Sequence, residues 1–424
     1  MKFSKILLTV CLILTVSISY SQEIKKTGGY ARLNGMGANP YVIDPYFNTV
    51  NPAWNAVYNN FILGDLGSAA GKPFSAGGYG QYLSTSFQVG DQWTLGGILA
   101  RSDFNGMSIA LLDPGSNGSI SPSYPGVVST VNNLISGGGV IPLDNNVELI
   151  GTYSFGQSAV GLGVAYASTS NEFTPPTGGS SEGSASQIGF NLGLISDVTS
   201  TLKLDLGASV IMPSASFEPD TLNETSASQT IITVNGRAFW ELNDNLQLVP
   251  LVLFSTESGS IDSGGASTGS VDMPSFSWFQ FGVGLNYQVG DFLLAGGAIF
   301  STSSLTRPAL SNVSPELTEG EKMFPIWNIG AEWNMIDWFV ARLGYIAYTG
   351  SSSYEYPNSQ NSKTEIVQTF FGPAQRGATV GVGFRFGGFS LDATVNEDVL
   401  RQGINNIGGG GSTFVYMTAG YVIP

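Results

Sequence analysis

The most regular pattern in this chain is the alternation of apolar and polar residues in short runs. In residues 327–335 the odd-numbered positions are Trp, Ile, Ala, Trp and Met, and the even-numbered positions are Asn, Gly, Glu and Asn. The same period of two occurs in residues 187–194, 202–210 and 379–386. Successive side chains of a β-strand point to opposite faces, so these runs predict strands with one apolar face.

The polar face of these runs consists mainly of Gly, Asn, Ser and Thr, with an occasional charge. A soluble β-protein would carry more Lys and Glu on its outward face. The pattern therefore favours an apolar face that meets lipid and a small, polar face that lines a lumen, as in a transmembrane β-barrel. A secreted soluble β-protein is the alternative.

Short and long connectors alternate along the chain, and this alternation predicts the topology. Short turns are expected at 90–91, 155–157, 197–200, 243–245, 290–291, 336–337 and 387–388. Long polar linkers are expected at 102–146, 169–184, 214–226, 255–273, 302–321, 348–375 and 396–411. Outer-membrane barrels have short periplasmic turns and long external loops. With a first strand at 61–67 and a last strand at 413–422, the pattern gives about sixteen strands of about 9–11 residues each.

Composition agrees with a membrane barrel and excludes several kinds of chemistry. Charged residues make up 11% of the chain, below the about 25% of ordinary soluble domains. The formal net charge of −15 argues against a nucleic-acid partner. The chain has no His, and its one Cys is Cys11, so a catalytic site that depends on His or Cys is excluded and a zinc site is not expected. We expect no enzyme activity, no metal and no cofactor.

Residues 1–21 have the form of a secretory signal peptide. Lys2 and Lys5 precede an apolar run, and Ser19-Tyr20-Ser21 is a small-x-small cleavage site. After this segment, no stretch has the about 18–20 consecutive apolar residues of a membrane helix. For an exported apolar chain of this kind, we expect a closed barrel in the outer membrane, with outer-membrane lipid as a partner.

Tryptophan supports the proposed orientation. Trp93, Trp240, Trp333 and Trp338 lie beside predicted short turns. Trp prefers the membrane interface because its ring is apolar and its N–H needs a polar partner. We therefore expect an aromatic girdle on the periplasmic side.

The stretch "ARLNGMGANPYVIDPYFNTVNPAW", residues 31–54, differs from everything that follows it. Pro40, Pro45 and Pro52 cannot donate hydrogen bonds to a strand ladder. The stretch is too polar and too broken for a spanning strand, and it lies between the signal peptide and the first strand. We predict a small folded segment that enters the barrel mouth and fills it.

This stretch resembles the N-terminal signature of the outer-membrane long-chain fatty-acid transporter (FadL-like) superfamily, which includes the PorV and PorQ barrels of type IX secretion in Bacteroidetes. The matching residues are Arg32, Gly35, Met36, Gly37, Ala38, Asp44, Asn51, Pro52 and Ala53. The family usually has Trp before Asn-Pro-Ala, whereas here Val50 precedes the triplet and Trp54 follows it. The resemblance implies that residues 30–57, including Trp54, form a hatch that plugs the lumen, and that the barrel has fourteen strands.

The expected fold is an all-β transmembrane antiparallel barrel of about 14 strands, in a range of 14–16, with an N-terminal hatch in its lumen. Residues 22–57 are the expected N-terminal segment and hatch, and residues 58–424 the barrel. In the family, ligand leaves through a lateral opening at a strand kink or bulge. Pro250 is a candidate for such a break, because proline removes a ladder donor.

Several charged residues fall on the inward face of the predicted strands. They are Glu148, Lys203, Asp205, Arg237, Glu241, Glu332, Arg342 and Arg385. One interpretation is that they pair across the lumen and hold the shape of the barrel. The other is that Arg237, Arg342 and Arg385 meet a substrate carboxylate, which arginine binds in a bidentate manner.

The resemblance implies passive uptake of a small hydrophobic ligand across the outer membrane. An accessory barrel of type IX secretion, with secretion-system proteins as partners, is the second hypothesis. An open general porin for polar solutes is the third. A transporter needs an apolar pocket closed by the hatch, whereas a porin needs a continuous wet channel.

Overall fold

The computed structural model describes residues 27–66, 81–101, 126–135, 139–143, 145–174, 176, 179–220, 223–264, 270–309, 315–357, 363–372, 377–395 and 414–424. The expected signal peptide, residues 1–21, lies outside the described residues. Among those described, no helix is long and apolar enough to cross a membrane.

The described chain begins with three short helical elements and continues as strands. The helical elements are α2 (Tyr30–Gly35), η2 (Pro45–Thr49) and η3 (Pro52–Ala56), and a further helix, α3 (Val127–Leu134), follows the third strand. The strands are β1 (Phe61–Leu66), β2 (Gln81–Val89), β3 (Trp93–Arg101), β4 (Asn145–Phe155), β5 (Ser158–Phe173), β6 (Ser181–Thr199), β7 (Leu202–Glu218), β8 (Thr225–Asn243), β9 (Leu246–Ser263), β10 (Ser270–Asp272), β11 (Ser275–Val289), β12 (Phe292–Arg307), β13 (Leu317–Ile336), β14 (Phe339–Pro357), β15 (Lys363–Gly372), β16 (Ala378–Phe386), β17 (Phe389–Val395) and β18 (Phe414–Val422).

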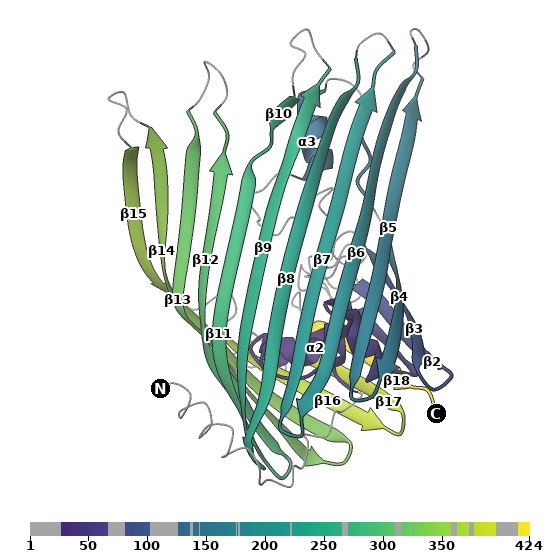
Figure 1. The fold of residues 1–424 in the computed structure, drawn as a ribbon, viewed down its shortest axis with the longest axis vertical. Coiled ribbons are helices and arrows are strands. Elements are labelled where there is room, and N and C mark those ends of the chain that lie inside the picture. The colour runs from purple at the N-terminus through teal and green to yellow at the C-terminus, as the bar shows by residue number, and fades with distance from the viewer. Residues whose placement is uncertain are drawn as a thin grey trace, which may run out of the picture.

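The strands form one closed antiparallel ring (Figure 1). Apart from β10 with β11 and β15 with β16, each strand pairs with its neighbour in the sequence, and β1 pairs with both β2 and β18, which closes the ring. β10 and β11 both pair with β9, and β15 and β16 both pair with β14. The eighteen described strands therefore occupy sixteen positions around the ring. The pattern-based count of about sixteen is confirmed, and the fourteen strands implied by the resemblance are wrong.

The predicted short turns are present, but several predicted long linkers are largely strand. Strands β6, β8 and β13 contain 19, 19 and 20 residues, far more than the expected spanning length. In β6, β7 and β9 the error has a physical cause, because their upper outward positions inside the predicted linkers carry Ser, as at Ser184, Ser216 and Ser258. Polar outward residues read as loop in the sequence, although the strand ladder continues through them. We refer to the end with the short turns as the short-turn end and to the other as the long-loop end.

The predicted faces agree with the structure. Along β6, Ile188, Phe190 and Leu192 are exposed on the outside of the ring, and Gln187 and Asn191 are buried inside it. The four tryptophans beside the short turns are 52, 36, 49 and 47% exposed in sequence order, as expected for residues that face lipid or its interface. The large apolar side chains exposed on this wall thus form a lipid-facing belt.

The proposed ladder break at Pro250 is local and occurs on one side of the strand. The pairing of β9 with β8 skips Val249 and Pro250, between the pairs Arg237–Leu251 and Trp240–Leu248. Strand β9 runs through Pro250, which pairs with Val283 of β11. The registers with β8 and β11 are the same before and after the proline. A register shift does occur in β13, between Met323 and Ile326, next to Pro325.

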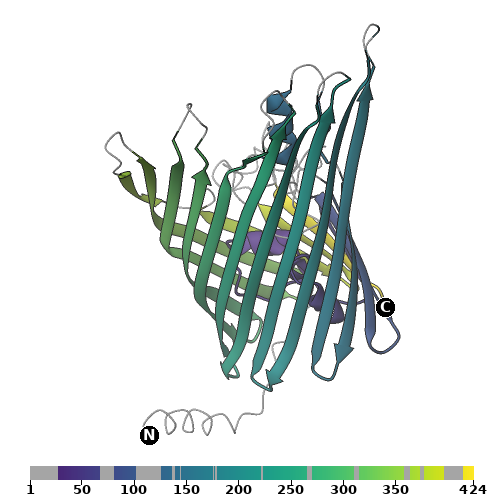
Figure 2. The ribbon, with the colours of Figure 1, turned by 45° about the horizontal axis from the view of Figure 1, so that its top comes forward.

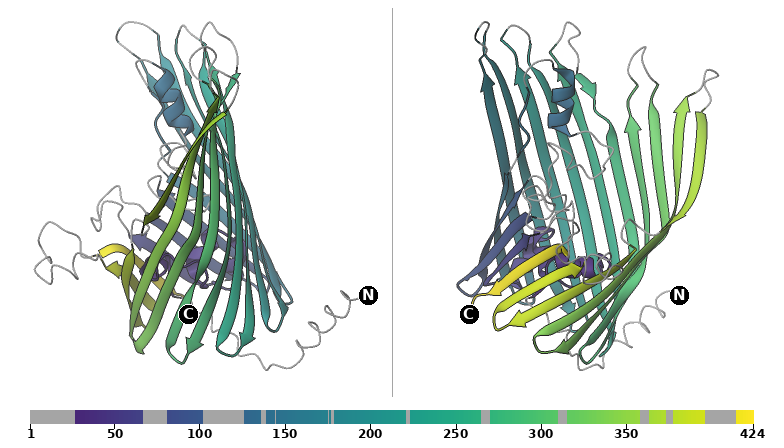
Figure 3. Two further views of the ribbon diagram at one scale, coloured as in Figure 1. Left: turned by 90° about the vertical axis from the view of Figure 1, so that its left-hand side faces the viewer. Right: turned by 180° about the vertical axis from the view of Figure 1, so that it is seen from behind.

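Two groups of buried residues fill the interior at different heights. The helical elements of residues 28–58 lie inside the ring and nearer the short-turn end, whereas α3 lies nearer the long-loop end (Figures 2 and 3). Helix α3 packs against inward residues of β7 and β8, among them Phe217 and Ala227. We call residues 28–58 the N-terminal segment.

Candidate functional site

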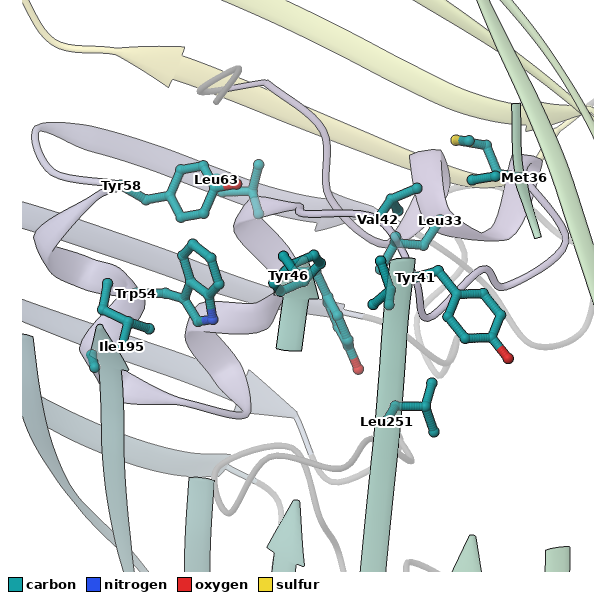
Figure 4. Close-up of a cluster of buried hydrophobic side chains, with 14 of the residues drawn as sticks. Leu33, Met36, Tyr41, Val42, Tyr46, Trp54, Tyr58, Leu63, Ile195 and Leu251 are labelled. Atoms are coloured by element: carbon teal, nitrogen blue, oxygen red, sulfur yellow. The ribbon is translucent and has the colours of Figure 1, made fainter. Parts of the chain in front are cut away.

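The candidate site is the interface between the N-terminal segment and the inner wall. The segment contributes Leu33, Met36, Tyr41 and Trp54 to a buried apolar cluster, which Ile195 and Leu251 of the wall complete (Figure 4). Trp54 and Met36 have no exposed surface. The segment therefore packs against the wall as a protein core does, with large side chains that are removed from water.

Local sequence explains the two short 3₁₀-helices of the segment. Pro45 and Pro52 occupy their first positions, where a missing N–H costs nothing. The residue before each proline caps the turn, because the side chain of Asp44 accepts a hydrogen bond from Tyr46 N at 2.8 Å and that of Asn51 accepts one from Ala53 N at 2.9 Å. The Asp-Pro and Asn-Pro-Ala motifs thus act first as folding signals of the segment.

Arg32 connects the segment to the wall through buried charge. Its Nε and Nη2 atoms donate to the two carboxylate oxygens of Glu332, at 2.7 and 3.1 Å, and Nη1 donates to Asp44 at 3.0 Å. Burial alone would lower the pKa of Arg32, but Glu332 and Asp44 together raise it, so the guanidinium stays charged. Burial raises the pKa of Asp44 to about 6, although Arg32 and the N–H of Tyr46 favour its charged form.

The same cluster continues along the wall. Arg342 Nε donates to Glu332 at 2.6 Å, and Arg342 Nη1 lies 2.7 Å from Asp392 as an ion pair. Arg385 Nη2 donates to the same oxygen of Asp392 at 2.7 Å. Together with Arg32 and Asp44, these residues make a cluster of three arginines and three carboxylates. Its charges balance, which a buried cluster requires.

A second polar anchor lies on the other side of the segment. Arg237 Nη1 donates to the carbonyl oxygens of Pro40 and Val42, at 3.0 and 3.1 Å, while Nε donates to Asp205 at 2.9 Å. The guanidinium also stacks 3.6 Å from the centre of the Phe47 ring. Asp205 in turn accepts from Asn51 at 2.7 Å.

Paired glycines of the wall make room for the main chain of the segment. Gly161 of β5 lies opposite Gly193 of β6. A Cβ on Gly161 would lie 2.4 Å from the carbonyl carbon of Pro52, and one on Gly193 would lie 1.8 Å from Oδ1 of Asn51. No larger residue fits at either position while Asn-Pro-Ala keeps its place.

A second glycine pair receives the other motif. Gly330 of β13 lies opposite Gly344 of β14. A Cβ on Gly330 would lie 2.5 Å from the carbonyl oxygen of Met36, and one on Gly344 would lie 2.0 Å from the nitrogen of Gly37. The two motifs that carry the family resemblance therefore rest on two glycine pairs of the wall, which we call the glycine seats.

Inward polar side chains of the wall satisfy the irregular backbone of the segment. Asn286 donates to Tyr41 O at 2.8 Å, Asn328 to Gly37 O at 2.9 Å, and Thr152 to Pro52 O at 2.7 Å. A buried, non-regular backbone needs such partners. The small polar residues on the inward face thus bind the segment rather than line a wet channel at this height.

The predicted site residues fall into four groups. All nine predicted hatch residues are buried in the segment: Arg32, Gly35, Met36, Gly37, Asp44, Asn51, Pro52, Ala53 and Trp54. Of the predicted inward charges, five take part in the two polar anchors: Asp205, Arg237, Glu332, Arg342 and Arg385. Glu148 is buried elsewhere, on the inward face of β4. Lys203 pairs with Asp197 at 2.6 Å, and both Lys203 and Glu241 line a cavity of about 200 Å³ with Ile43 at the short-turn end.

Sequence reasoning missed Asp392, Asn286, Asn328 and Thr152. Asp392 has an inward position in the alternating run of β17, so the signal was present. Among the described residues, no group of three or more His, Cys, Asp or Glu residues could hold a metal ion.

Comparisons with known proteins give distant likenesses to solved structures alone. No family model matches the chain, and no curated protein matches it. The FrpB iron transporter from Neisseria meningitidis is similar at 10% identity and a TM-score of 0.37, over 81% of this chain and 62% of that chain. The toluene transporter TodX from Pseudomonas putida is similar at 10% identity and a TM-score of 0.34, over 94% and 97%. The siderophore receptor PiuA from Acinetobacter baumannii is similar at 10% identity and a TM-score of 0.40, over 77% and 52%.

This chain spans less than two thirds of FrpB and PiuA, and likeness at these scores carries no argument about function. The wall itself is informative, because its closed ring leaves no strand edge at the level of the belt of outward apolar side chains. This chain is an outer-membrane β-barrel. Its N-terminal segment occupies the lumen of that barrel.

Proposed function

We propose that the barrel transports small hydrophobic compounds across the outer membrane and that the N-terminal segment is its hatch. The observation that carries this proposal is the way in which the segment is held. It contacts the wall through ion pairs, side-chain hydrogen bonds and the glycine seats, and does not join the strand ladder. The hatch can therefore leave its place without breaking the pairing of any two strands of the wall.

A small apolar patch on the inner wall above the hatch favours an apolar ligand. On β7, Asp205 contacts the hatch and Ala215 packs in the cluster around α3, and Ile211 lies between them. Ile211 forms a buried apolar group with Ala165 and Ile231. Glu148 pairs with Ala165 and Glu257 with Ile231 on the flanking strands, so an apolar solute at this level meets a small apolar patch bordered by buried polar groups.

An open porin is less well supported. A porin requires a continuous polar channel, whereas here the described charges at the level of the hatch are paired with one another. Arg237, Arg342 and Arg385 each face a carboxylate of the protein, so the structure supports their structural interpretation over carboxylate capture from a substrate.

A reversible tether tests the proposed hatch. Asn34 of the segment donates to Thr394 of β17 at 3.1 Å, so the double variant Asn34→Cys/Thr394→Cys places one thiol on the hatch and one on the facing wall, and its disulfide is formed by oxidation and verified by thiol titration. The mature chain expected from the sequence contains no other cysteine. We expect the oxidised variant to block entry of a hydrophobic fluorophore that an intact outer membrane excludes, and reduction to restore it. Conductance in a planar bilayer should rise when residues 30–57 are deleted.

The control tether lies within the wall. Ser184 and Ser216 face each other across β6 and β7 with their oxygens 3.1 Å apart. The variant Ser184→Cys/Ser216→Cys should transport equally in both redox states. Equal transport by the oxidised and reduced hatch tether would refute the proposal. A silent barrel with and without the hatch would direct attention to protein partners, as expected for a secretion accessory.

A further inference from the structure

The outer surface of the wall changes character sharply above the lipid-facing belt. Along β8, the outward residues Val234 and Ile232 are exposed and apolar, and the next outward residues are Thr230, Ser228 and Ser226. The strand ladder continues unchanged in register through this transition, since Thr233 pairs with Ser255 and Ser228 with Ser260. The outward face of β8 therefore changes directly from the apolar lipid-facing belt to a surface of Ser and Thr hydroxyls.

The same transition occurs on the adjacent strands. On β9 the outward residue Phe254 is followed by Thr256, Ser258 and Ser260. On β11 and β12 the outward residues above the apolar ones also carry hydroxyls. They pair in register, Ser277 with Ser304 and Ser275 with Thr306. These hydroxyls lie at the height of the head groups of the outer leaflet, because the apolar positions below them face the acyl chains.

This hydroxyl surface contains a groove of about 540 Å³. The groove lies where the wall is irregular, between β10 and β11, which both pair with β9. Six hydroxyl residues line it: Ser228, Thr230, Ser258, Ser260, Ser275 and Thr306. Its volume is within the about 300–1,000 Å³ of pockets that bind small molecules.

The remaining lining defines the chemistry of the occupant. Asp272 and Glu316 supply carboxylates and Pro308 supplies apolar surface, and no Lys or Arg is among the described residues of the lining. Gln229, Gly259 and Met273 complete the lining, with Gln229 and Met273 almost fully buried. Hydroxyls both donate and accept hydrogen bonds, and carboxylates accept them. A phosphate would receive hydrogen bonds from the hydroxyls but would be repelled by the two carboxylates, with no cation to offset them, whereas a neutral sugar presents hydroxyls to both kinds of group and an apolar ring face to Pro308.

We propose that this groove binds the neutral saccharide head group of a glycolipid in the outer leaflet. The position commits the site to a lipid-linked sugar, because Thr230 of the groove is followed on the outward face of β8 by Ile232, which belongs to the belt that contacts the acyl chains. The proposal is independent of the transport function and of the hatch, which lies inside the wall.

Dodecyl maltoside is a suitable probe, since it joins an apolar tail to a neutral disaccharide. The refolded barrel in a tetraethylene glycol detergent is titrated with the maltoside, and the retained molecules are counted by native mass spectrometry. We expect one maltoside retained in preference to dodecyl phosphate. The variant Ser228→Ala/Ser258→Ala/Ser260→Ala should weaken retention at least about tenfold.

The matched control removes outward hydroxyls of the same surface outside the groove. Ser168→Ala/Ser170→Ala/Ser184→Ala should retain the maltoside like the unchanged protein. Should the groove triple variant not refold, the single change Ser258→Trp fills the groove at an exposed position and should also abolish retention. Equal retention by the groove and control variants, or tighter binding of dodecyl phosphate, would overturn the site. Binding of free maltose as tight as that of the maltoside would overturn its assignment to a glycolipid.

Discussion

Replacement of Glu332 by Gln removes one charge from the centre of the buried cluster. Glu332 accepts two hydrogen bonds from Arg32 of the hatch and one from Arg342 of the wall. The variant keeps the size of the side chain but leaves three arginines with two carboxylates. Arg32 and Arg342 then face each other across a neutral group, and their repulsion is relieved when the hatch moves away.

The magnitude follows from the burial of the cluster. Removing one partner of a buried ion pair costs about 3–5 kcal/mol, and we take the lower end because Gln keeps one carbonyl oxygen as an acceptor. This free energy weakens the docked state of the hatch relative to the released state, in which Arg32 is hydrated. About 3 kcal/mol corresponds to a roughly 100-fold larger equilibrium constant for release. Single-channel recording should show this as a higher open probability, and limited proteolysis as faster cleavage within residues 28–58.

The same strand provides the control. Glu319, also on β13, pairs with Arg307 at 3.3 Å, but both side chains are partly exposed, at 28 and 39%. Such a pair contributes about 0–1 kcal/mol, so Glu319→Gln should leave the hatch unchanged. If the two variants opened equally often, or if Glu332→Gln unfolded the whole barrel before releasing the hatch, the reasoning would be refuted.

Three further changes test the other contacts of the hatch. Gly193→Ala places a Cβ against Asn51 and should raise the open probability at least about tenfold, whereas Gly151→Ala, where a Cβ meets no atom within 4 Å, should not; bilayer recording compares them. Arg237→Lys keeps the charge but loses the forked donation to two carbonyls and the ring stacking, so proteolysis of the hatch should become roughly tenfold faster at unchanged barrel stability. The docked hatch binds a proton at Asp44 more tightly than the released one, with a pKa near 6 against 3.8, so docking should weaken as pH rises from about 4 to 6 and change little above 7. Asp44→Asn should remove this pH dependence of conductance, and a rise in open probability on acidification would contradict the assignment.

The wall could be predicted from the sequence because its information is local. Period-two alternation in residues 327–335 identifies the outward face of β13, and a Gly-Asp pair such as Gly290-Asp291 marks a turn whatever the rest of the chain does. Closure of the ring then fixes the number of strands. The heights of the strands were not predicted, because Ser214 and Ser216 on an outward face have the composition of a loop and the pairing of a strand.

The contacts of the hatch could be predicted only in part, because they depend on which strands meet across the lumen. The inward position of Asp392 follows from its run, but its pairing with Arg342 and Arg385 requires that β14, β16 and β17 lie side by side. Sequence separation between Arg32 and Glu332 is 300 residues. Neither spacing nor charge pattern indicates such a partner.

The glycine seats connect the wall, which local patterns predict, with the contacts of the hatch, which they do not. Gly330 and Gly193 read in the sequence as small members of a polar face, a role that Ser or Asn could equally fill. In the structure each is opposite another glycine on the neighbouring strand, and together the two pairs receive Met36-Gly37 and Asn51-Pro52-Ala53. A one-residue slip between β5 and β6 would turn one member of a pair to the lipid and close that seat. Strand register and the hatch motifs therefore constrain each other, and the motif residues are matched to the wall through main-chain contact rather than through side-chain chemistry.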